Sequence, residues 1–279
     1  MPFRFRQSIC NEVFEGWEFA DTCRAVKKAG YEGIEIAHFT LKDSPTAITA
    51  AEREEYRRIM HGEGLEFVGL HWLMVAPKGL HVTTPDTELR RKSWQHIDDL
   101  IDLSADLAGG APSKMIFGSP KQRTSTGGAT PAEAFKNYEA GLAGVAKHAE
   151  RRGVTVLAEV LPRRDSDVLN LEDEAAALVA RIGSPAIQTM FDTHNAADET
   201  DPHPAVVEKH FGIIKHIHVN EMDGRHPGTG DYDFVALLAT LKRLDYPGWV
   251  SLEVFDFSAG AETIATDSLH YLNSVIATL

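Results

Sequence analysis

Cysteine is scarce in this sequence, because Cys10 and Cys23 are the only two among 279 residues. Two cysteines are too few for a disulfide scaffold in a secreted chain, and they do not form the close pair of a thiolate metal site. Cys23 falls in a helical apolar pattern, which indicates a core position. Cys10 ends a strand-like run, where it would be a small buried hydrophobe or line a pocket.

Positive charge and long apolar runs are lacking as well. The formal net charge of -13 argues against a broad nucleic-acid surface, which needs Lys and Arg to neutralise phosphates, and against binding to anionic membranes. No segment approaches the ~18 consecutive apolar residues of a membrane span. The opening letters MPFRFRQSIC lack the apolar core of a signal peptide. We therefore expect a soluble chain in the reducing cytoplasm, with no nucleic-acid partner and no membrane partner.

A glycine-rich phosphate loop is missing after the first predicted strand, where the sequence reads CNEVFEG. A doubly wound open sheet usually carries such a loop, so its absence favours a barrel. No linker or low-complexity tract interrupts the chain, and we expect one domain over residues 1–279. Short apolar runs alternate with helical patterns, which predicts an α/β fold of the (β/α)8 TIM-barrel type. The predicted strands are 3–9, 32–37, 66–71, 114–118, 154–160, 187–192, 213–219 and 249–255.

Three acids and a histidine mark the ends of four consecutive predicted strands. A single acid at such a place more often caps a helix, and a single histidine is more often a hydrogen-bonded core residue. At the active face of a barrel, however, several carboxylates would repel one another and lose solvation unless a divalent cation joined them. Three carboxylates and one imidazole suit Mn²⁺, Mg²⁺ or Co²⁺ better than a thiolate-loving ion. The four residues are Glu159, Asp192, His218 and Glu253.

Five segments of the sequence resemble a known family. KKAGYEGIEI, at the second predicted strand, is similar to a segment of the xylose isomerase-like TIM-barrel superfamily of sugar isomerases and epimerases. AEVLPRRDSDVLN, FDTHNAADE, HVNEMDGRHPGTG and GWVSLEVF resemble the fifth to eighth strand regions of D-tagatose and D-allulose 3-epimerases. The resemblance covers nearly the whole chain and implies a TIM barrel that acts as a sugar isomerase or epimerase.

The resemblance also implies a metal site and a mechanism. Glu159, Asp192, His218 and Glu253 would bind one divalent metal ion, with Mn²⁺ preferred and Mg²⁺, Co²⁺ or Zn²⁺ as alternatives. Glu159 and Glu253 would in addition be the acid/base pair on opposite faces of a bound ketose. The cation would stabilise the enediolate that forms when the proton beside the carbonyl leaves. Proton transfer on two faces gives epimerisation, whereas one face gives 1,2-isomerisation or no net change.

Substrate contacts are implied too, and here the sequence departs from the family. The resemblance assigns substrate hydroxyls to Asp165, Glu221 and Arg225. The ketose 3-epimerases usually have a histidine three positions after the sixth-strand aspartate, where this chain has Asn195 and places His194 one position earlier. The arginine comes one place later than in the family. The identity of the sugar, and whether it is phosphorylated, therefore stays open.

Two further features lie near the expected active face. His71 ends the third predicted strand, where it would contact the substrate or pack in the core. The segment SPKQRTSTGG, residues 119–128, follows the fourth predicted strand and fits a flexible loop, a phosphate-binding loop or a lid.

Other functions fit parts of the sequence. A metal-dependent dehydratase, a lyase of an inosose or keto-sugar, would use the same scaffold, and loss of water from the product would distinguish it. An apurinic endonuclease would need more metal ligands and a basic face, which are lacking. A binding protein with a vestigial site would hold no metal. The predicted partner is a small sugar or keto-sugar, and the resemblance implies a homodimer or a homotetramer.

Overall fold

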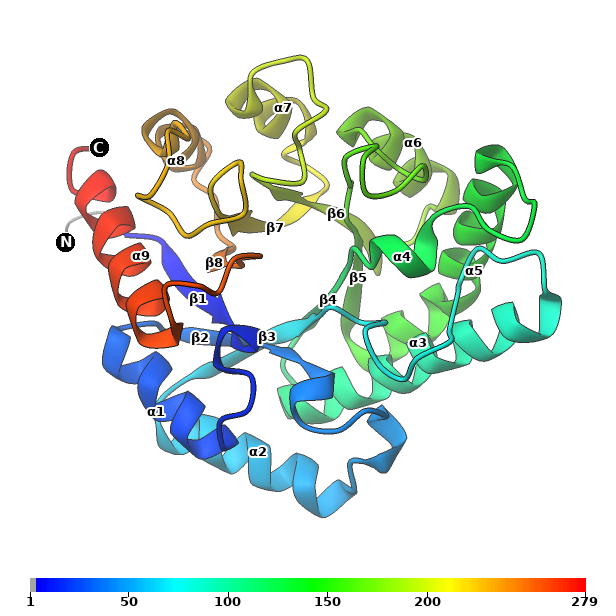
Figure 1. Cartoon of the computed structure of the whole chain (residues 1–279), viewed down its shortest axis with the longest axis horizontal. Coiled ribbons are helices and arrows are strands. Elements are labelled where there is room, and N and C mark those ends of the chain that lie inside the picture. The colour runs from blue at the N-terminus through cyan, green and yellow to red at the C-terminus, as the bar shows by residue number, and fades with distance from the viewer. Residues whose placement is uncertain (1–3) are drawn as a thin grey trace.

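The strands form a closed parallel barrel. In the computed structural model, which describes residues 4–279, each strand pairs with the next in the chain and β1 pairs with β8. Figure 1 shows the strands at the centre and the helices outside. The (β/α)8 barrel that the sequence predicts is therefore confirmed. The strands are β1 Arg6–Cys10, β2 Gly33–Ala37, β3 Glu66–His71, β4 Ser113–Phe117, β5 Val154–Ala158, β6 Ile187–Asp192, β7 Ile214–Val219 and β8 Trp249–Leu252.

Helices connect the strands and cover the outside of the barrel (Figure 1). Among residues 4–279, none of them is long and apolar enough to cross a membrane. The α-helices are α1 Phe19–Ala29, α2 Ala50–Gly62, α3 Thr87–Ala108, α4 Pro120–Arg123, α5 Pro131–Arg152, α6 Glu172–Ile182, α7 His203–His210, α8 Phe234–Arg243 and α9 Ala261–Ile276. Short 3-10 helices are η1 Asn11–Phe14, η2 His38–Thr40 and η3 Pro45–Ala47.

The strands are buried on both faces, which explains their apolar runs in the sequence. Every residue of β2 is buried, as are all but the first of β1. β3 and β6 have the bounds that the sequence predicts, whereas β8 ends at Leu252 instead of residue 255. Because the chain leaves the barrel there, Glu253 stands just past the last paired residue of β8.

The apolar stripes predicted for the helices form the layer between the helices and the barrel. On α5, Tyr138, Leu142 and Val145 are buried as the stripe requires. The same helix lies very close to α3, since a Cβ atom built on Gly141 would be 1.8 Å from Cε2 of Trp94. A side chain at this position would overlap the indole, so glycine sets how closely the two helices approach.

Candidate active site

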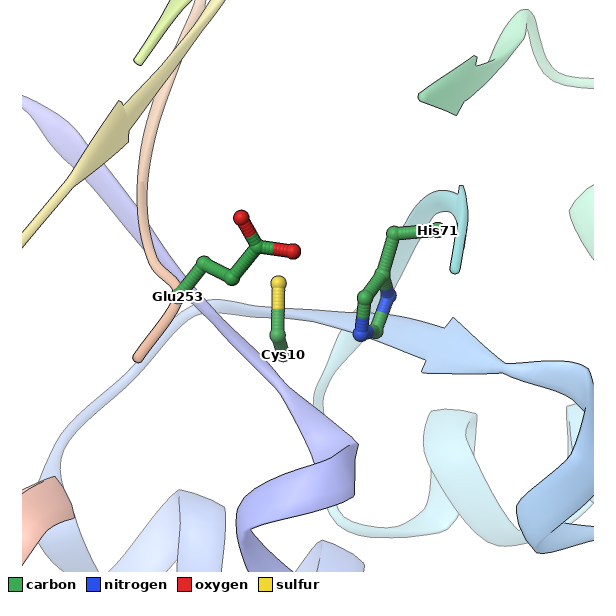
Figure 2. Close-up of side chains that lie close together, drawn as sticks. All are labelled: Cys10, His71 and Glu253. Carbon is green, nitrogen blue, oxygen red and sulfur yellow. The ribbon is translucent and has the colours of Figure 1, made fainter. Parts of the chain in front are cut away.

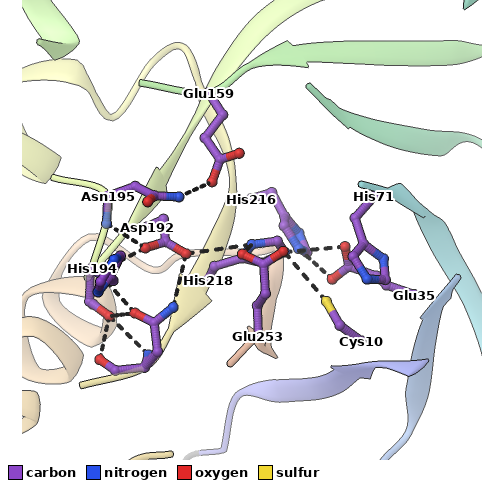
Figure 3. Close-up of polar contacts among 12 residues, drawn as sticks. Cys10, Glu35, His71, Glu159, Asp192, His194, Asn195, His216, His218 and Glu253 are labelled. Atoms are coloured by element: carbon purple, nitrogen blue, oxygen red, sulfur yellow. Dashed lines mark hydrogen bonds and ion pairs between the residues drawn. The ribbon is translucent and has the colours of Figure 1, made fainter. Parts of the chain in front are cut away.

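The four acid and histidine side chains from the ends of β5 to β8 meet at the mouth of the barrel (Figure 3). Each offers one ligand atom, and these four atoms all lie within 4.8 Å of one another. All four side chains are buried, and Glu159, at 4% exposed, is the most accessible of them. The structure therefore brings together the residues that the sequence predicts as metal ligands, which are Glu159, Asp192, His218 and Glu253.

Asp192 is held rigidly by the turn that follows it. Its Oδ1 accepts hydrogen bonds from the backbone N–H groups of His194 at 2.8 Å and Asn195 at 2.7 Å. Its Oδ2 accepts one from Nδ2 of Asn220 at 3.2 Å and lies 3.7 Å from Nδ1 of His218. Asp192 therefore caps the turn and also faces the cluster, so a capping role does not exclude ligation here.

Glu159 is positioned by three neighbours. Nδ2 of Asn195 donates to its Oε1 at 2.9 Å. Nη1 of the fully buried Arg123, on α4, donates to its backbone carbonyl at 2.7 Å and to that of Phe117 at 2.9 Å. A Cβ atom on Gly118 would lie 2.2 Å from Oε2 of Glu159, so a side chain at this position would displace the carboxylate. The 119–128 segment is thus anchored at the site through α4.

Glu253 has an unusual indole partner. Nε1 of Trp72 donates to its Oε1 at 2.8 Å, and Nδ1 of His218 lies 3.1 Å from its Oε2. Trp72 has a backbone φ of 49°, which is rare for a residue with a side chain. Such strain persists only where surrounding contacts hold it, and here the contact fixes one oxygen of a site carboxylate.

The electrostatics of the cluster fit a divalent cation. Burial, together with the charges of Glu253 and Asp192, raises the pKa of Glu159 to about 8. Burial also raises the pKa of Glu253, although His218 opposes it. Burial lowers the pKa of His218, but the charges of Glu253 and Glu35 outweigh it and raise that pKa well above its usual value. A cation among these groups would remove the repulsion and hold the carboxyls ionised.

The buried acid behind His218 was not predicted from the sequence. Glu35 of β2 is fully buried, and its Oε2 lies 3.2 Å from Nε2 of His218 while its Oε1 accepts from Nε2 of His216 at 2.7 Å. Burial opposes ionisation, but the two imidazoles outweigh it and hold the pKa of Glu35 well below its usual range. The only signal in the sequence was an acid inside an otherwise apolar strand.

His71 lies below the mouth and does not line the cavity. Its Nε2 bonds to Oε2 of the buried Glu12, whose charge raises the pKa of His71 against the effect of burial. Figure 2 shows Cys10 between His71 and Glu253. Burial and the charges of Glu35 and Glu12 raise the pKa of the Cys10 thiol well above its usual value. Sγ of Cys10 lies 3.9 Å from Nε2 of His218, so the thiol packs against this imidazole.

A cavity of about 450 Å³ opens beside the cluster and brings together three of the predicted substrate residues: Asp165, His194 and Asn195. Glu159 and Glu253 also form part of its wall. Nη2 of Arg164 donates to Nε2 of His194 at 2.9 Å, which fixes that ring. The rest of the wall is formed by Trp72, Val75, Lys78, Ile116, Gly118, Ser119, Pro120, Lys121, Gln122, Leu161 and Phe255.

Glu221 and Arg225 do not line this cavity, and their contact with substrate hydroxyls stays a prediction. Both carboxylate oxygens of Glu221 accept backbone N–H groups of its own loop, from Gly228 at 2.9 Å and Tyr232 at 3.0 Å. Arg225 is half-exposed and pairs with Asp223 at 2.8 Å. Neither residue lines the cavity, because the loop after β7 folds back on itself.

Comparison with known proteins covers most of the chain. The family model of the xylose isomerase-like TIM barrel matches residues 23–275. An L-ribulose 3-epimerase of Methylomonas sp. is 24% identical over 242 residues, which are 86% of this chain and 80% of that protein. A D-psicose 3-epimerase of Agrobacterium fabrum is 30% identical over 127 residues, which are 46% of this chain and 43% of that protein.

Solved structures share the whole fold. A crystal structure of D-psicose 3-epimerase in the presence of D-fructose has a TM-score of 0.83 at 20% identity, covering 97% of this chain and 99% of that one. A 3-keto-D-glucoside 4-epimerase from E. coli also has a TM-score of 0.83, at 19% identity, covering 97% and 100%. Because the curated relatives are ketose 3-epimerases, the predicted isomerase class is confirmed. The chain belongs to the xylose isomerase-like TIM barrel family.

Proposed function

We propose that this chain is a divalent-metal-dependent ketose epimerase in which Glu159 and Glu253 form the acid/base pair. The observation that carries the proposal is the convergence, within 4.8 Å, of four ligand atoms from four consecutive strand ends. Two of these residues, Glu159 and Glu253, also line the cavity, so they can reach both a cation and a substrate. The names of the curated relatives, which are ketose 3-epimerases, support the substrate class.

The donor set supports Mn²⁺ as the cofactor, because three carboxylates and one imidazole are ligands that this ion accepts readily. Glu159, Asp192, His218 and Glu253 would hold it. A bound divalent cation supplies Lewis-acid stabilisation of the negative charge that develops on the substrate oxygens.

The two carboxylates come from strands that are not neighbours in the barrel, β5 and β8, which supports proton transfer on two faces of one carbon. One carboxylate removes the proton beside the ketose carbonyl and the other returns a proton to the opposite face, so the configuration inverts. Such positioned acid/base groups contribute roughly 10²–10⁴-fold to a rate. Asn195 and Trp72 each donate one hydrogen bond that orients a member of the pair.

Three cavity residues are proposed to contact substrate hydroxyls: Asp165, His194 and Asn195. Asp165 is half-exposed on the cavity wall, beside Arg164 at 3.3 Å. Asn195 offers a neutral amide that can donate and accept at once.

The test is a ketose panel in D₂O with the Mn²⁺-loaded protein, followed by NMR and mass spectrometry. We expect deuterium at the inverted carbon of one or more ketoses, with no loss of water from the product. Loss of water would instead identify a dehydratase on the same scaffold.

The matched variants are Glu253→Gln and Glu159→Gln, with Glu172→Gln as the control. Glu172 is also fully buried, and burial raises its pKa well above the usual value, so a neutral glutamine replaces a neutral acid there. Epimerisation should fall at least ~100-fold in the two site variants and stay near wild type in the control. Full deuterium exchange by Glu253→Gln would contradict the two-carboxylate mechanism.

A further inference from the structure

Aromatic side chains form a lip at the mouth of the barrel, beside the proposed metal site. The aromatic lip consists of Phe39 after β2, Trp72 after β3, and Phe255 and Phe257 after β8. The ring of Trp72 lies almost parallel to that of Phe255, at 5° and 6.3 Å between centroids. Phe39 also stacks against Trp72, at 23° and 6.2 Å between centroids. Phe257 is tilted by 58° against Trp72 at 6.4 Å.

The lip is continuous with the cavity. Trp72 and Phe255 line the cavity together with Glu159 and Glu253, whereas Phe39 and Phe257 lie beyond its wall. The lip therefore begins at the reacting centre and extends outward. Nε1 of Trp72 donates to Oε1 of Glu253 at 2.8 Å, so the lip is joined directly to a proposed acid/base residue.

The lip is also held in place from the neighbouring loop. The backbone N–H groups of Phe255 and Asp256 donate to the carbonyl of Gly224, at 2.8 and 3.2 Å. Gly224 has a φ of 83°, and a Cβ atom there would lie 3.1 Å from Cβ of Phe255. Because Gly224 has no side chain, the loop after β7 can pack closely against Phe255.

Two members of the lip are unusually exposed. Phe255 is 38% and Phe257 39% exposed, which places both among the few large apolar side chains of residues 4–279 that face solvent. Exposed aromatic groups beside a binding cavity are typical of ligand contact, because their faces bind flat apolar surfaces. Phe39 and Phe257 do not line the cavity, so a monosaccharide confined to the cavity would leave these two rings uncovered.

We propose that the aromatic lip is a subsite for a second ring, joined to the reacting sugar and presenting a flat apolar face. The substrate is then a keto-sugar glycoside, with a sugar or aromatic aglycone, instead of a free monosaccharide. This inference rests on the proposed function, since it assumes that the reacting keto-sugar lies at the site of Glu159 and Glu253. It assigns Trp72 to orientation of the sugar and the two exposed rings, Phe255 and Phe257, to contact with the aglycone.

The experiment compares two keto-glycosides that differ only in the aglycone. Phenyl and methyl 3-keto-glucoside are turned over by the Mn²⁺-loaded full chain, and kcat/KM is measured for each. We expect the phenyl compound to be favoured about tenfold or more, as burial of one aromatic ring requires. Phe255→Ala and Phe257→Ala should each reduce this preference, and the double variant should abolish it. Val235→Ala, at an exposed apolar position on α8, should leave it unchanged.

A binding measurement separates failure of this inference from failure of the proposed function. The unreactive phenyl and methyl glucosides are titrated by calorimetry, and the same preference and the same loss in the variants are expected. If the protein prefers the phenyl glucoside but turns over no ketose, the epimerase proposal is wrong and the subsite proposal stands. If both glycosides are turned over with equal kcat/KM, the subsite proposal is wrong. Conversion of a dimer to a monomer by Phe255→Ala and Phe257→Ala, with selectivity unchanged, would instead make the lip an interface between two copies.

Discussion

At the scale of single residues, each proposed carboxylate ligand uses one oxygen to bond a neutral donor. Oδ1 of Asp192 bonds backbone N–H groups, Oε1 of Glu159 bonds the amide of Asn195, and Oε1 of Glu253 bonds the indole of Trp72. None of these donors carries a positive charge, so they orient the carboxylates without neutralising them. The cluster therefore retains its negative charge, which would attract a cation.

Glu35 should contribute to metal affinity through His218, although it is not a proposed ligand. Its carboxylate favours a proton on Nε2 of His218 and so leaves the lone pair on Nδ1, the nitrogen that faces Glu253. We expect Glu35→Gln to weaken Mn²⁺ binding roughly 10- to 100-fold, because the amide orients the imidazole less well. Competition with a chelator gives the dissociation constant, and ¹⁵N NMR of His218 gives the tautomer.

The control for this variant is Glu12→Gln. Glu12 is also buried and also bonds a histidine, but His71 is outside the four proposed ligands. Mn²⁺ affinity should change little in this variant. An unchanged affinity in Glu35→Gln would show that His218 does not depend on its buried carboxylate.

Residues at strand ends and those shortly after them could be placed from the sequence, whereas Glu35 inside a strand and Arg225 in the loop after β7 could not. Glu159 and Asp192 follow recognisable apolar runs, and the barrel brings all such ends to one face. Glu35 lies inside a strand, where the direction of a side chain depends on a register that periodicity alone does not give. Arg225 lies in a loop whose path is decided by contacts such as those of Glu221 with backbone N–H groups.

At the scale of elements, apolar runs located every strand, but the ends were less certain. β8 stops at Leu252 although the apolar letters continue to residue 255, because the chain turns out of the barrel. Phe255, the last of these apolar residues, lies beyond the strand, and its exposed ring belongs to the aromatic lip. The 119–128 segment contains the short helix α4, whose Arg123 bonds two strand-end carbonyls. Such tertiary anchors leave no periodic signal in a sequence.

The contact between α3 and α5 should be sensitive to a single methyl group. Gly141→Ala places a Cβ atom where the indole of Trp94 lies, so the helices must separate or the indole must leave its position. We expect a loss of about 1–3 kcal/mol in the free energy of unfolding, as for other overpacked cores. Urea denaturation followed by circular dichroism measures it.

The same helix supplies the matched control. Gly144, one turn further along α5, is exposed and has nothing within 4 Å of an added Cβ atom. Gly144→Ala should therefore stabilise the protein by about 0.5–1 kcal/mol, because alanine is the better helix former. Equal effects of the two substitutions would mean that the close packing at Trp94 does not matter to stability.

At the scale of the whole molecule, the proposed ligands and their supports come from different halves of the barrel. The proposed ligands lie at or just after the ends of β5 to β8, whereas Glu35 lies in β2 and Trp72 just after β3. The formal net charge of -13 adds to this local concentration of acids. A cation is therefore expected to stabilise the complete barrel and not one segment of it.

Stabilisation by Mn²⁺ should increase with pH. In the metal-free fold the pKa of Glu159 is raised from 4.5 to about 8, so the folded chain holds a proton that the unfolded chain has released. Stability of the metal-free protein should then decline as the pH rises through that window, while metal binding, which needs the carboxylate, becomes stronger. We expect the increase in Tm on adding Mn²⁺ to be larger at pH 8 than at pH 6.

Glu159→Gln tests the assignment of this pH dependence. The variant has no proton to release at this position, so the difference between the two pH values should shrink. An increase in Tm that is equal at both pH values in the wild-type protein would contradict a raised pKa for Glu159.

Because β1 pairs with β8, the barrel can close only after β8 has been synthesised. The ribosome releases β1 first, and that strand keeps one unpaired edge until β8 has emerged. Glu253 follows β8, so the fourth proposed ligand is the last to leave the exit tunnel. A chain still being translated offers a metal ion only three of the four ligands. Loading of a metal at the complete four-ligand site is therefore expected to follow synthesis of this last strand.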